Sequence, residues 1–363
     1  MIALLHREDC CGCSACASAC PHGAIRMEAD GMGFRYPVID KDLCVDCGIC
    51  NNTCAFKPLN KPFEPKAEAI RFPDYLDNSQ SGGLAYAVMR KAIENGYIVY
   101  GAAMDDDFTV RHRRVQTPEG LEPLRLSKYV QSDMDGIPSQ VLADLKAGHK
   151  VLFTGTPCQC AGVASLCAGH RDALLLADII CRAVPSPAFW KSFLEEKQKS
   201  GKLKRVLFRD PALGWKNTMA RLDYEDRTEH TQEYYFFFIN NLINRPSCGQ
   251  CPFVTAHPSD ITMGDCWGVE KLLPGFADDG LGCSLLLTNT PSGEAFTDSF
   301  SVECRRHGIS MDAVLSYSAR SSAPMAGIVE KKYICKGYAG VNARYGVNSP
   351  REKFKKMVRR IIK

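Results

Sequence analysis

The chain has 363 residues, 45% of them hydrophobic and 24% charged, with a formal net charge of +4. These proportions are typical of a soluble globular protein with two or three domains, and they exclude a disordered chain or nucleic-acid binding driven by bulk charge. The nineteen cysteines, the lack of an export signal and the lack of the roughly 18 consecutive apolar residues that a membrane span needs predict a cytoplasmic protein with no transmembrane segment.

The N-terminal region contains the same cysteine pattern twice. Each run has the spacing C-x2-C-x2-C-x3-C, and Pro21 follows the first of them. The runs consist of Cys10, Cys13, Cys16 and Cys20, and of Cys44, Cys47, Cys50 and Cys54. This spacing is typical of bacterial ferredoxins, which hold two 4Fe–4S clusters. A zinc site or a disulfide framework agrees less well with this spacing. Zinc sites more often pair two C-x2-C units or include His, and disulfide frameworks occur in short secreted domains.

In such ferredoxins the fourth cysteine of each run binds the other cluster. We therefore expect cluster one to be held by Cys10, Cys13, Cys16 and Cys54, and cluster two by Cys44, Cys47, Cys50 and Cys20. Cys11 lies off the spacing, so we interpret it as a thiol without a ligand role.

The remaining sequence predicts an α/β body behind this ferredoxin head. Residues 24–27 and 33–36 are expected to form two short strands in the head, and the Pro-rich stretch at 60–66 indicates a domain boundary. From residue 79, apolar periodicity alternates between helix and strand, which favours a largely parallel sheet that becomes mixed towards the C-terminus. Helices are expected at 84–95, 137–147, 187–199 and 292–300, strands at 97–101, 150–155, 174–180, 203–208, 220–225 and 284–288, and a buried aromatic run at 234–238.

These elements predict four segments. Residues 1–60 form the two-cluster ferredoxin domain, 61–78 a linker, 79–325 the α/β domain, and 326–363 a C-terminal extension. The extension ends in seven basic residues between 351 and 363, with apolar residues at helical spacing. Such a basic amphipathic helix either packs on its own domain or contacts a partner or a membrane surface.

Cys158 stands out among the other cysteines. A predicted strand ends at Gly155, Thr156 is suited to cap the next helix, and Pro157 suits its first position. The dipole of that helix would stabilise a Cys158 thiolate, as a metal ligand or a redox nucleophile requires. Cys181 follows another predicted strand, so the two thiols are expected at the same edge of the sheet.

A further C-x2-C pair, Cys248 and Cys251, lies far from the head in sequence. If Cys158, Cys181, Cys248 and Cys251 converge, they can bind a third 4Fe–4S cluster. The alternatives are that Cys248 and Cys251 form a redox-active dithiol or are two unrelated thiols.

Two polar stretches offer binding groups for an anion. Ser81, Gly82 and Gly83 precede a predicted helix, whose first N–H groups bind phosphate readily, although a tight turn is also consistent with this sequence. Lys128 lies in a polar stretch at 127–132 that by itself is ambiguous.

Taken together, these segments resemble the coenzyme F-420 hydrogenase/dehydrogenase beta-subunit family, joined to a two-cluster ferredoxin domain. The resemblance extends to about residue 300, and the motifs at 81–83, 127–132, 155–159, 178–181, 185–187, 248–251 and 259–265 carry it. Two positions depart from the family pattern, because Cys266 stands where the family usually has Phe and Ala183 where it usually has Gly.

The resemblance implies a flavoprotein that passes electrons between a hydride carrier, usually the reduced deazaflavin, and iron–sulfur clusters. It implies FAD, with FMN as the alternative, and a third 4Fe–4S cluster on Cys158, Cys181, Cys248 and Cys251. The flavin-site residues it implies are Ser81, Gly82, Gly83, Lys128, Thr154, Gly155 and Thr156.

The expected function is therefore that of an iron–sulfur flavoenzyme. Its partners would be a redox small molecule, an electron-carrier protein or a partner subunit, with no nucleic acid. The alternatives are a non-catalytic electron-transfer subunit of a larger complex, and a disulfide reductase that uses Cys248 and Cys251.

Overall fold

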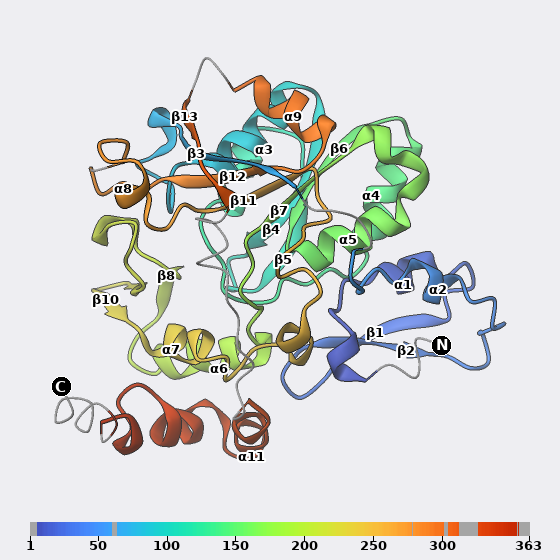
Figure 1. Cartoon of the computed structure of the whole chain (residues 1–363). Coiled ribbons are helices and arrows are strands. Elements are labelled where there is room, and N and C mark those ends of the chain that lie inside the picture. Colours follow the sequence, from blue (N-terminus) through green and yellow to red (C-terminus); the bar gives the residue numbers. More distant parts are fainter. Residues whose placement is uncertain are drawn as a thin grey trace.

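The structure is a computed structural model that describes residues 6–59, 64–277, 279–300, 304–311, 326–353 and 355 (Figure 1). The head contains an antiparallel hairpin of β1 (Ile25–Ala29) and β2 (Arg35–Ile39), as the sequence predicts to within three residues. Two short helices, α1 (Ala15–Ala19) and α2 (Ile49–Thr53), pack on each other and carry the ends of the two cysteine runs.

The body is built on one eight-stranded sheet with the order β13-β3-β12-β11-β7-β6-β4-β5. Its four central strands, β11, β7, β6 and β4, are parallel, and the strands on both flanks are antiparallel. This is the expected α/β fold. The strands are β3 (Lys66–Arg71), β4 (Tyr97–Met104), β5 (Val110–Val115), β6 (Lys150–Gly155), β7 (Leu174–Ile179), β11 (Ile261–Asp265), β12 (Ser284–Thr288) and β13 (Arg305–Gly308).

Helices cover both faces of this sheet because the side chains of each strand alternate between the faces. Val99 and Leu152 pack in one core with α3 (Leu84–Glu94) and α9 (Pro291–Asp298). The next residues along these strands, Tyr100 and Phe153, pack in a second core on the other face, with α4 (Ile137–Lys146) and α5 (Pro157–Leu166). The body is therefore a three-layer α/β/α unit.

The prediction of a linker over 61–78 is wrong for its central part. Residues 66–71 form β3, which lies between β12 and β13 and is almost entirely buried. Its sequence, KAEAIR, lacks β-branched residues at most positions, so that burial between two neighbours, and not local propensity, makes it a strand.

The strand expected at 203–208 does form, but outside the main sheet. It is β8 (Leu203–Leu207), in a separate antiparallel sheet with β9 (Ala220–Tyr224) and β10 (Thr228–Thr231). The aromatic run is helical, in α7 (Glu233–Ile239), and buries Tyr234, Phe237 and Phe238 as expected. A short α8 (Val269–Leu272) follows β11.

One hydrophobic core joins the head, this second sheet and the C-terminal region. Met32 and Phe34 of the head hairpin belong to the same cluster as residues of α6 (Pro187–Gln198), α7 and α11 (Ala326–Tyr345). Figure 1 shows α11 running beneath α6 and α7. In the same region, Arg7 forms ion pairs with both Asp30 and Glu330. The head is thus packed onto the body and not merely tethered to it.

The basic helix expected at 351–363 lies mostly outside the described residues. Among the helices that the structure describes, none is both long and apolar enough to span a membrane.

Candidate functional site

The thiols assigned to cluster one lie together in the structure. Burial raises the pKa of Cys16, and the nearby thiols of Cys13, Cys10 and Cys54 raise it further. Cys54 comes from the second run and lies near the thiols of the first run. The exchange of the fourth cysteine between the two clusters stays a prediction. Backbone N–H groups also donate hydrogen bonds to the thiols of Cys10, Cys13, Cys16 and Cys54.

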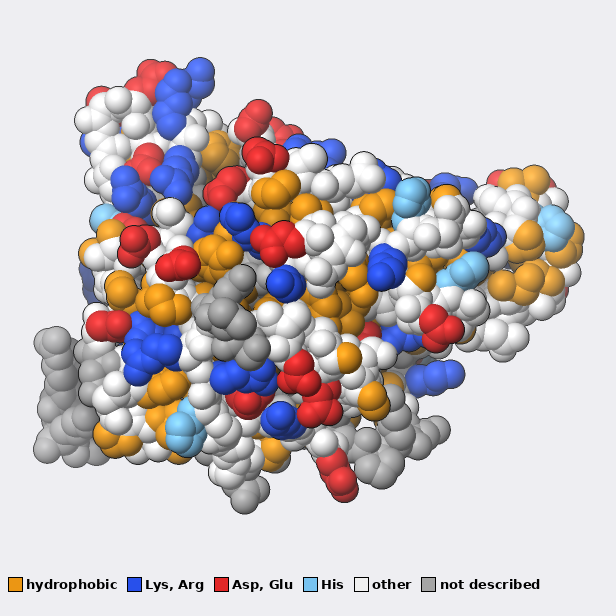
Figure 2. Space-filling view, turned by 90° about the horizontal axis from the view of Figure 1, so that it is seen from above, with side chains coloured by type: hydrophobic (Ala, Val, Ile, Leu, Met, Phe, Trp, Pro, Cys, Tyr) orange, Lys and Arg blue, Asp and Glu red, His pale blue; other side chains and the backbone are white. Residues whose placement is uncertain are grey.

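The thiols assigned to cluster two occupy the outer end of the head. Helix α1, whose C-cap is Cys20, packs on α2, which carries Cys50. Cys47 is exposed. It is surrounded in sequence by the exposed side chains of Leu43, Val45 and Ile49. Figure 2 shows the head projecting from the body, with hydrophobic side chains gathered at its tip.

Cys158 lies in the first turn of α5, as predicted. Thr156 caps this helix in a capping box with Gln159, and Pro157 is its first residue. The Thr156 Oγ1 atom lies 3.2 Å from the Cys158 Sγ atom. Hydrogen bonding by the Cys11 thiol, more than any other contact, lowers the pKa of Cys158 to about 7. Cys158 is therefore prepared to act as a thiolate.

Cys248 and Cys251 lie close to Cys158. Cys248 belongs to a short 3-10 helix, η7 (Pro246–Gln250), and Cys251 ends it. Burial raises the pKa of Cys248 to about 12, and the charges of Cys158 and Cys251 contribute to the same shift. The structure thus brings three of the four predicted third-cluster ligands together.

The fourth, Cys181, follows the end of β7 and lines the cavity described below. Because β7 pairs in parallel with β6, Cys181 and Cys158 follow neighbouring strand ends, as expected. No group of three or more His, Cys, Asp or Glu side chains in the described residues is placed to bind a single metal ion. A 4Fe–4S cluster requires a wider spacing, since each thiolate binds a different iron. The assignment of these four ligands stays a prediction.

Cys11, which the sequence pattern left without a role, lies at the contact between head and body. Its thiol is buried, and it hydrogen-bonds with both Cys13 of the head and Cys158 of the body. In the same contact, a Cβ atom at Gly162 of α5 would lie only 2.6 Å from the Cys13 Sγ atom. Helix α5 can approach the first cysteine run this closely because position 162 has no side chain.

A cavity of ≈ 610 Å³ opens at the carboxyl ends of the central strands. Its volume suits a large organic cofactor or ligand. Six of the seven predicted flavin-site residues line it: Ser81, Gly83, Lys128, Thr154, Gly155 and Thr156. Gly82 has a packing role instead, because a Cβ atom there would lie 2.4 Å from the Ile70 carbonyl oxygen.

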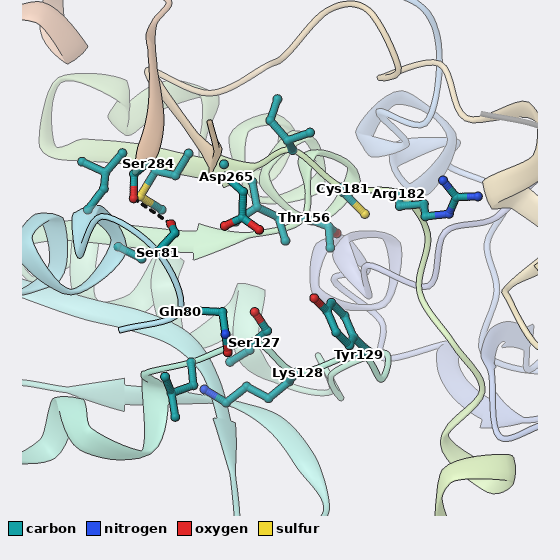
Figure 3. Close-up of a pocket in the computed structure, with 18 of the residues that line it drawn as sticks. Gln80, Ser81, Ser127, Lys128, Tyr129, Thr156, Cys181, Arg182, Asp265 and Ser284 are labelled. Carbon is teal, nitrogen blue, oxygen red and sulfur yellow. Dashed lines mark hydrogen bonds between the residues drawn. The ribbon is translucent and has the colours of Figure 1, made fainter. Parts of the chain in front are cut away.

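One wall of the cavity carries polar groups that suit an anionic ligand (Figure 3). Gln80 is 9% exposed, and neither its Nε2 nor its Oε1 atom has a hydrogen-bond partner in the part of the chain that the structure describes. Burial lowers the pKa of Lys128 to about 7, and its ammonium group donates a hydrogen bond to the Arg125 carbonyl oxygen at 2.6 Å. Helix α3 begins beside them at Gly83 and has no acidic residue in its first turn. Its free N–H groups therefore add a positive dipole end.

The opposite wall contains residues that the sequence analysis did not assign to the site. Asp265 of β11 pairs with Arg209 at 2.7 Å, and the Arg209 guanidinium lies over the Trp267 ring, 5.5 Å from its centroid. The motif at 259–265 contains Asp265, but nothing in the sequence connects it with Arg209. Cys266 is buried and lines the cavity close to Cys283.

A buried polar chain beneath the cavity holds the loop between β6 and α5. His112 of β5 donates from Nε2 to the Thr154 carbonyl oxygen at 3.0 Å and accepts at Nδ1 from the Ser132 hydroxyl. Gln159 donates to the same Ser132 oxygen and accepts from the Thr156 N–H. Burial lowers the pKa of His112 to about 4, so it is neutral near pH 7.

This buried His112 predicts acid sensitivity. Its pKa is about 4 in the folded chain and about 6.5 in the unfolded chain, so the unfolded state takes up the proton first as the pH falls. We expect a loss of about 2 kcal/mol between pH 8 and pH 5 from this residue. Thermal unfolding of wild type and His112→Gln over this range measures it. Equal losses of stability in both proteins would contradict the prediction.

Two family models match the chain. Residues 148–305 match the model for the C-terminal part of the beta subunit of coenzyme F420 hydrogenase/dehydrogenase. Residues 9–57 match the 4Fe-4S dicluster domain. The first match covers the body from β6 to α9, and the second covers both cysteine runs of the head.

The curated relatives include proteins from Methanocaldococcus jannaschii. A coenzyme F420-dependent sulfite reductase is 28% identical over 166 residues, which is 43% of this chain and 25% of that protein. The chain therefore spans only about a quarter of that relative. An uncharacterised protein is 23% identical over 329 residues, which is 79% of this chain and 85% of that protein.

The fold is shared with a solved structure. It is a chain of the F420-reducing [NiFe] hydrogenase complex from Methanosarcina barkeri, with a TM-score of 0.50 and 18% identity. The match covers 80% of this chain and 97% of that chain. It supports the arrangement of the main sheet and its helices.

Proposed function

Because the chain belongs to the coenzyme F420 hydrogenase/dehydrogenase beta-subunit family and carries an N-terminal 4Fe-4S dicluster domain, we propose that it transfers electrons between a hydride carrier and three 4Fe–4S clusters by means of a bound flavin. Family membership makes it an F420-related iron–sulfur oxidoreductase or electron-transfer subunit. The flavin, the third cluster and the hydride carrier are the proposed part. The carrier is the reduced deazaflavin F420 or a substitute for it.

The observation that carries the flavin proposal is the polar wall of the cavity. Gln80 is buried there without partners, and Lys128 has no carboxylate partner among the described residues. Both fit a ligand that supplies hydrogen-bonding groups and negative charge, as the pyrophosphate of FAD does. A flavin in this cavity would accept two electrons as a hydride and release them one at a time, or do the reverse.

The residues of the chain would have distinct tasks around this ligand. Lys128 and the first N–H groups of α3 would hold the phosphates, and Gln80 would fix the position of a polar edge. The Arg209–Asp265 pair holds Trp267 against Trp215, whose ring lies 5.0 Å away centroid to centroid, and so shapes the opposite wall. Thr156 and Cys181 stand where the cavity meets the thiols of the body.

The thiols would then provide a continuous path from the cavity to the tip of the head. Cys181 lines the cavity, Cys158 lies next to Cys11 and Cys13, and the second run includes the exposed Cys47. We propose that an electron-carrier protein or partner subunit docks at the apolar tip of Leu43, Val45 and Ile49. The related hydrogenase chain is part of a complex, which also leaves a purely electron-conducting subunit as the second candidate.

Anaerobic cofactor analysis of the purified chain tests this function. Three clusters and one flavin predict about twelve iron atoms, about twelve acid-labile sulfides and one flavin per chain. About eight iron atoms and no flavin would leave only the ferredoxin head and support the electron-conducting subunit. About eight iron atoms together with a Cys248–Cys251 pair that interconverts between dithiol and disulfide would support the disulfide reductase instead.

A further inference from the structure

Arg245 is a fully buried cation at the contact between the head and the body. Its side chain is 2% exposed, and its residue directly precedes η7, which carries Cys248. The Cys248 N–H donates to the Arg245 carbonyl oxygen at 3.0 Å. The position of Arg245 is therefore tied to a predicted ligand of the third cluster, the body cluster.

The guanidinium group of Arg245 is held mainly by the head. Its Nε atom donates to the Cys10 carbonyl oxygen at 2.8 Å, and one Nη atom donates to the Arg35 carbonyl oxygen at 2.8 Å. That Nη atom also lies 3.7 Å from the Cys10 Sγ atom. The other Nη atom donates to Gln131, which in turn donates to the Cys11 carbonyl oxygen.

The surrounding residues pack closely around this group. A Cβ atom at Gly12 would lie 2.7 Å from an Arg245 nitrogen. The Tyr36 ring lies against the guanidinium, with its centroid 4.3 Å from the Cζ atom, and the Phe34 ring lies at 5.4 Å. The cation is thus built into the contact and cannot reach solvent.

The charge of Arg245 has no counter-charge among the described carboxylates. No Asp or Glu oxygen of these residues lies within 4.0 Å of its nitrogens. Burying an unpaired ion costs several kcal/mol, and neutral carbonyl oxygens offset only part of this. Stable burial therefore requires a negative charge nearby.

The charges that the chain brings closest are its thiols. On the head side, the guanidinium lies 3.7 Å from the Cys10 Sγ atom. On the body side, the Arg245 carbonyl oxygen accepts from the Cys248 N–H at 3.0 Å. Cys10 and Cys248 belong to two different predicted clusters, and Arg245 contacts both residues.

We propose that Arg245 is the shared counter-ion of cluster one in the head and of the cluster in the body, and that it sets the reduction potentials of both. For the body cluster, this inference rests on the proposed function. A cluster with four thiolates carries −2 when oxidised and −3 when it has accepted one electron. A fixed cation stabilises the more negative state, so Arg245 raises both potentials.

Redox titrations followed by electron paramagnetic resonance test this in the full chain. Arg245→Gln removes the charge but keeps hydrogen-bond donors, and Arg245→Lys keeps the charge. Arg26→Gln is the matched control, because Arg26 lies on the same head but is exposed to solvent. Iron analysis of each variant shows whether its clusters are present, and Cys158→Ala identifies the signal of the body cluster.

In Arg245→Gln we expect the ratio of reduced to oxidised cluster at a fixed potential to fall at least tenfold for two clusters, which is about 59 mV for a one-electron couple. Cluster two, Arg245→Lys and Arg26→Gln are expected to stay close to wild type. Loss of iron in Arg245→Gln but not in Arg245→Lys also supports the counter-ion role, because Arg245→Lys retains the positive charge.

Three results would overturn the inference: unchanged potentials in Arg245→Gln with full iron content, an equal shift of all three clusters, or equal loss of iron in both Arg245 variants. The last result would mean that Arg245 acts through its shape alone. If wild type binds only about eight iron atoms, the proposed function fails, yet the shift of cluster one still tests Arg245.

Discussion

Replacing Cys158 with Ala is expected to remove the body cluster and to interrupt electron transfer between the cavity and the head. The iron content should fall from about twelve to about eight atoms per chain, because the two clusters of the head have their own ligands. The flavin should remain bound, since Cys158 does not line the cavity. A hydride donor should then reduce the flavin but no longer the head clusters, which rapid-mixing absorbance spectroscopy distinguishes.

Cys160→Ala is the matched control for this experiment. Cys160 lies on the same helix two residues later, but it points into the core between α5 and the main sheet. Its replacement should leave about twelve iron atoms and normal reduction of the head. If Cys158→Ala retains the same iron content as wild type, Cys158 is not a ligand, and its low pKa needs another explanation.

The affinity for the flavin is expected to fall as the pH rises above 7. Lys128 has a pKa of about 7 because it is buried, and a bound phosphate would raise that pKa by favouring the ammonium form. Binding above pH 7 must therefore take up a proton, which weakens affinity by about tenfold per pH unit. Flavin titrations of the deflavinated protein by fluorescence quenching between pH 6 and pH 9 measure this.

Lys128→Met should bind flavin about 10- to 100-fold more weakly at pH 6 and lose the pH dependence, since a charged hydrogen bond contributes about 1.5–3 kcal/mol. Lys146→Met serves as the control, because Lys146 is exposed on α4 and does not line the cavity. A pH dependence that persists in Lys128→Met would assign it to another group and remove Lys128 from the phosphate site.

The parts of this molecule that the sequence predicts well are those encoded by local spacing. The two cysteine runs, the cap at Thr156 and the alternation around β6 and β7 depend on residues a few positions apart. Each of these patterns corresponds to one local geometry, such as a ligand loop or a helix start. The predicted flavin-site residues also gather in one cavity, because the carboxyl ends of parallel strands meet at one edge.

The parts that could not be predicted depend on contacts between distant segments. Gln80 becomes significant only because folding buries it without partners, and β3 is a strand only because β12 and β13 enclose it. Arg245 looks in sequence like any cation beside a C-x2-C pair. Its role can be inferred only from its contact with the Cys10 carbonyl oxygen, 235 positions earlier in the chain.

The hydrophobic core shared by the head hairpin and α11 has a consequence for how the protein is made. Met32 and Phe34 leave the ribosome early, whereas Val329 and Tyr333, which complete their core, are synthesised much later. The head therefore reaches its final packing only after α11 has been translated. Iron–sulfur assembly on the first cysteine run would start before the core of the head is complete. The packing of α11 would then stabilise the assembled head. A chain truncated before residue 326 should consequently lose its clusters more readily to oxygen and chelators, even though all its ligands are present.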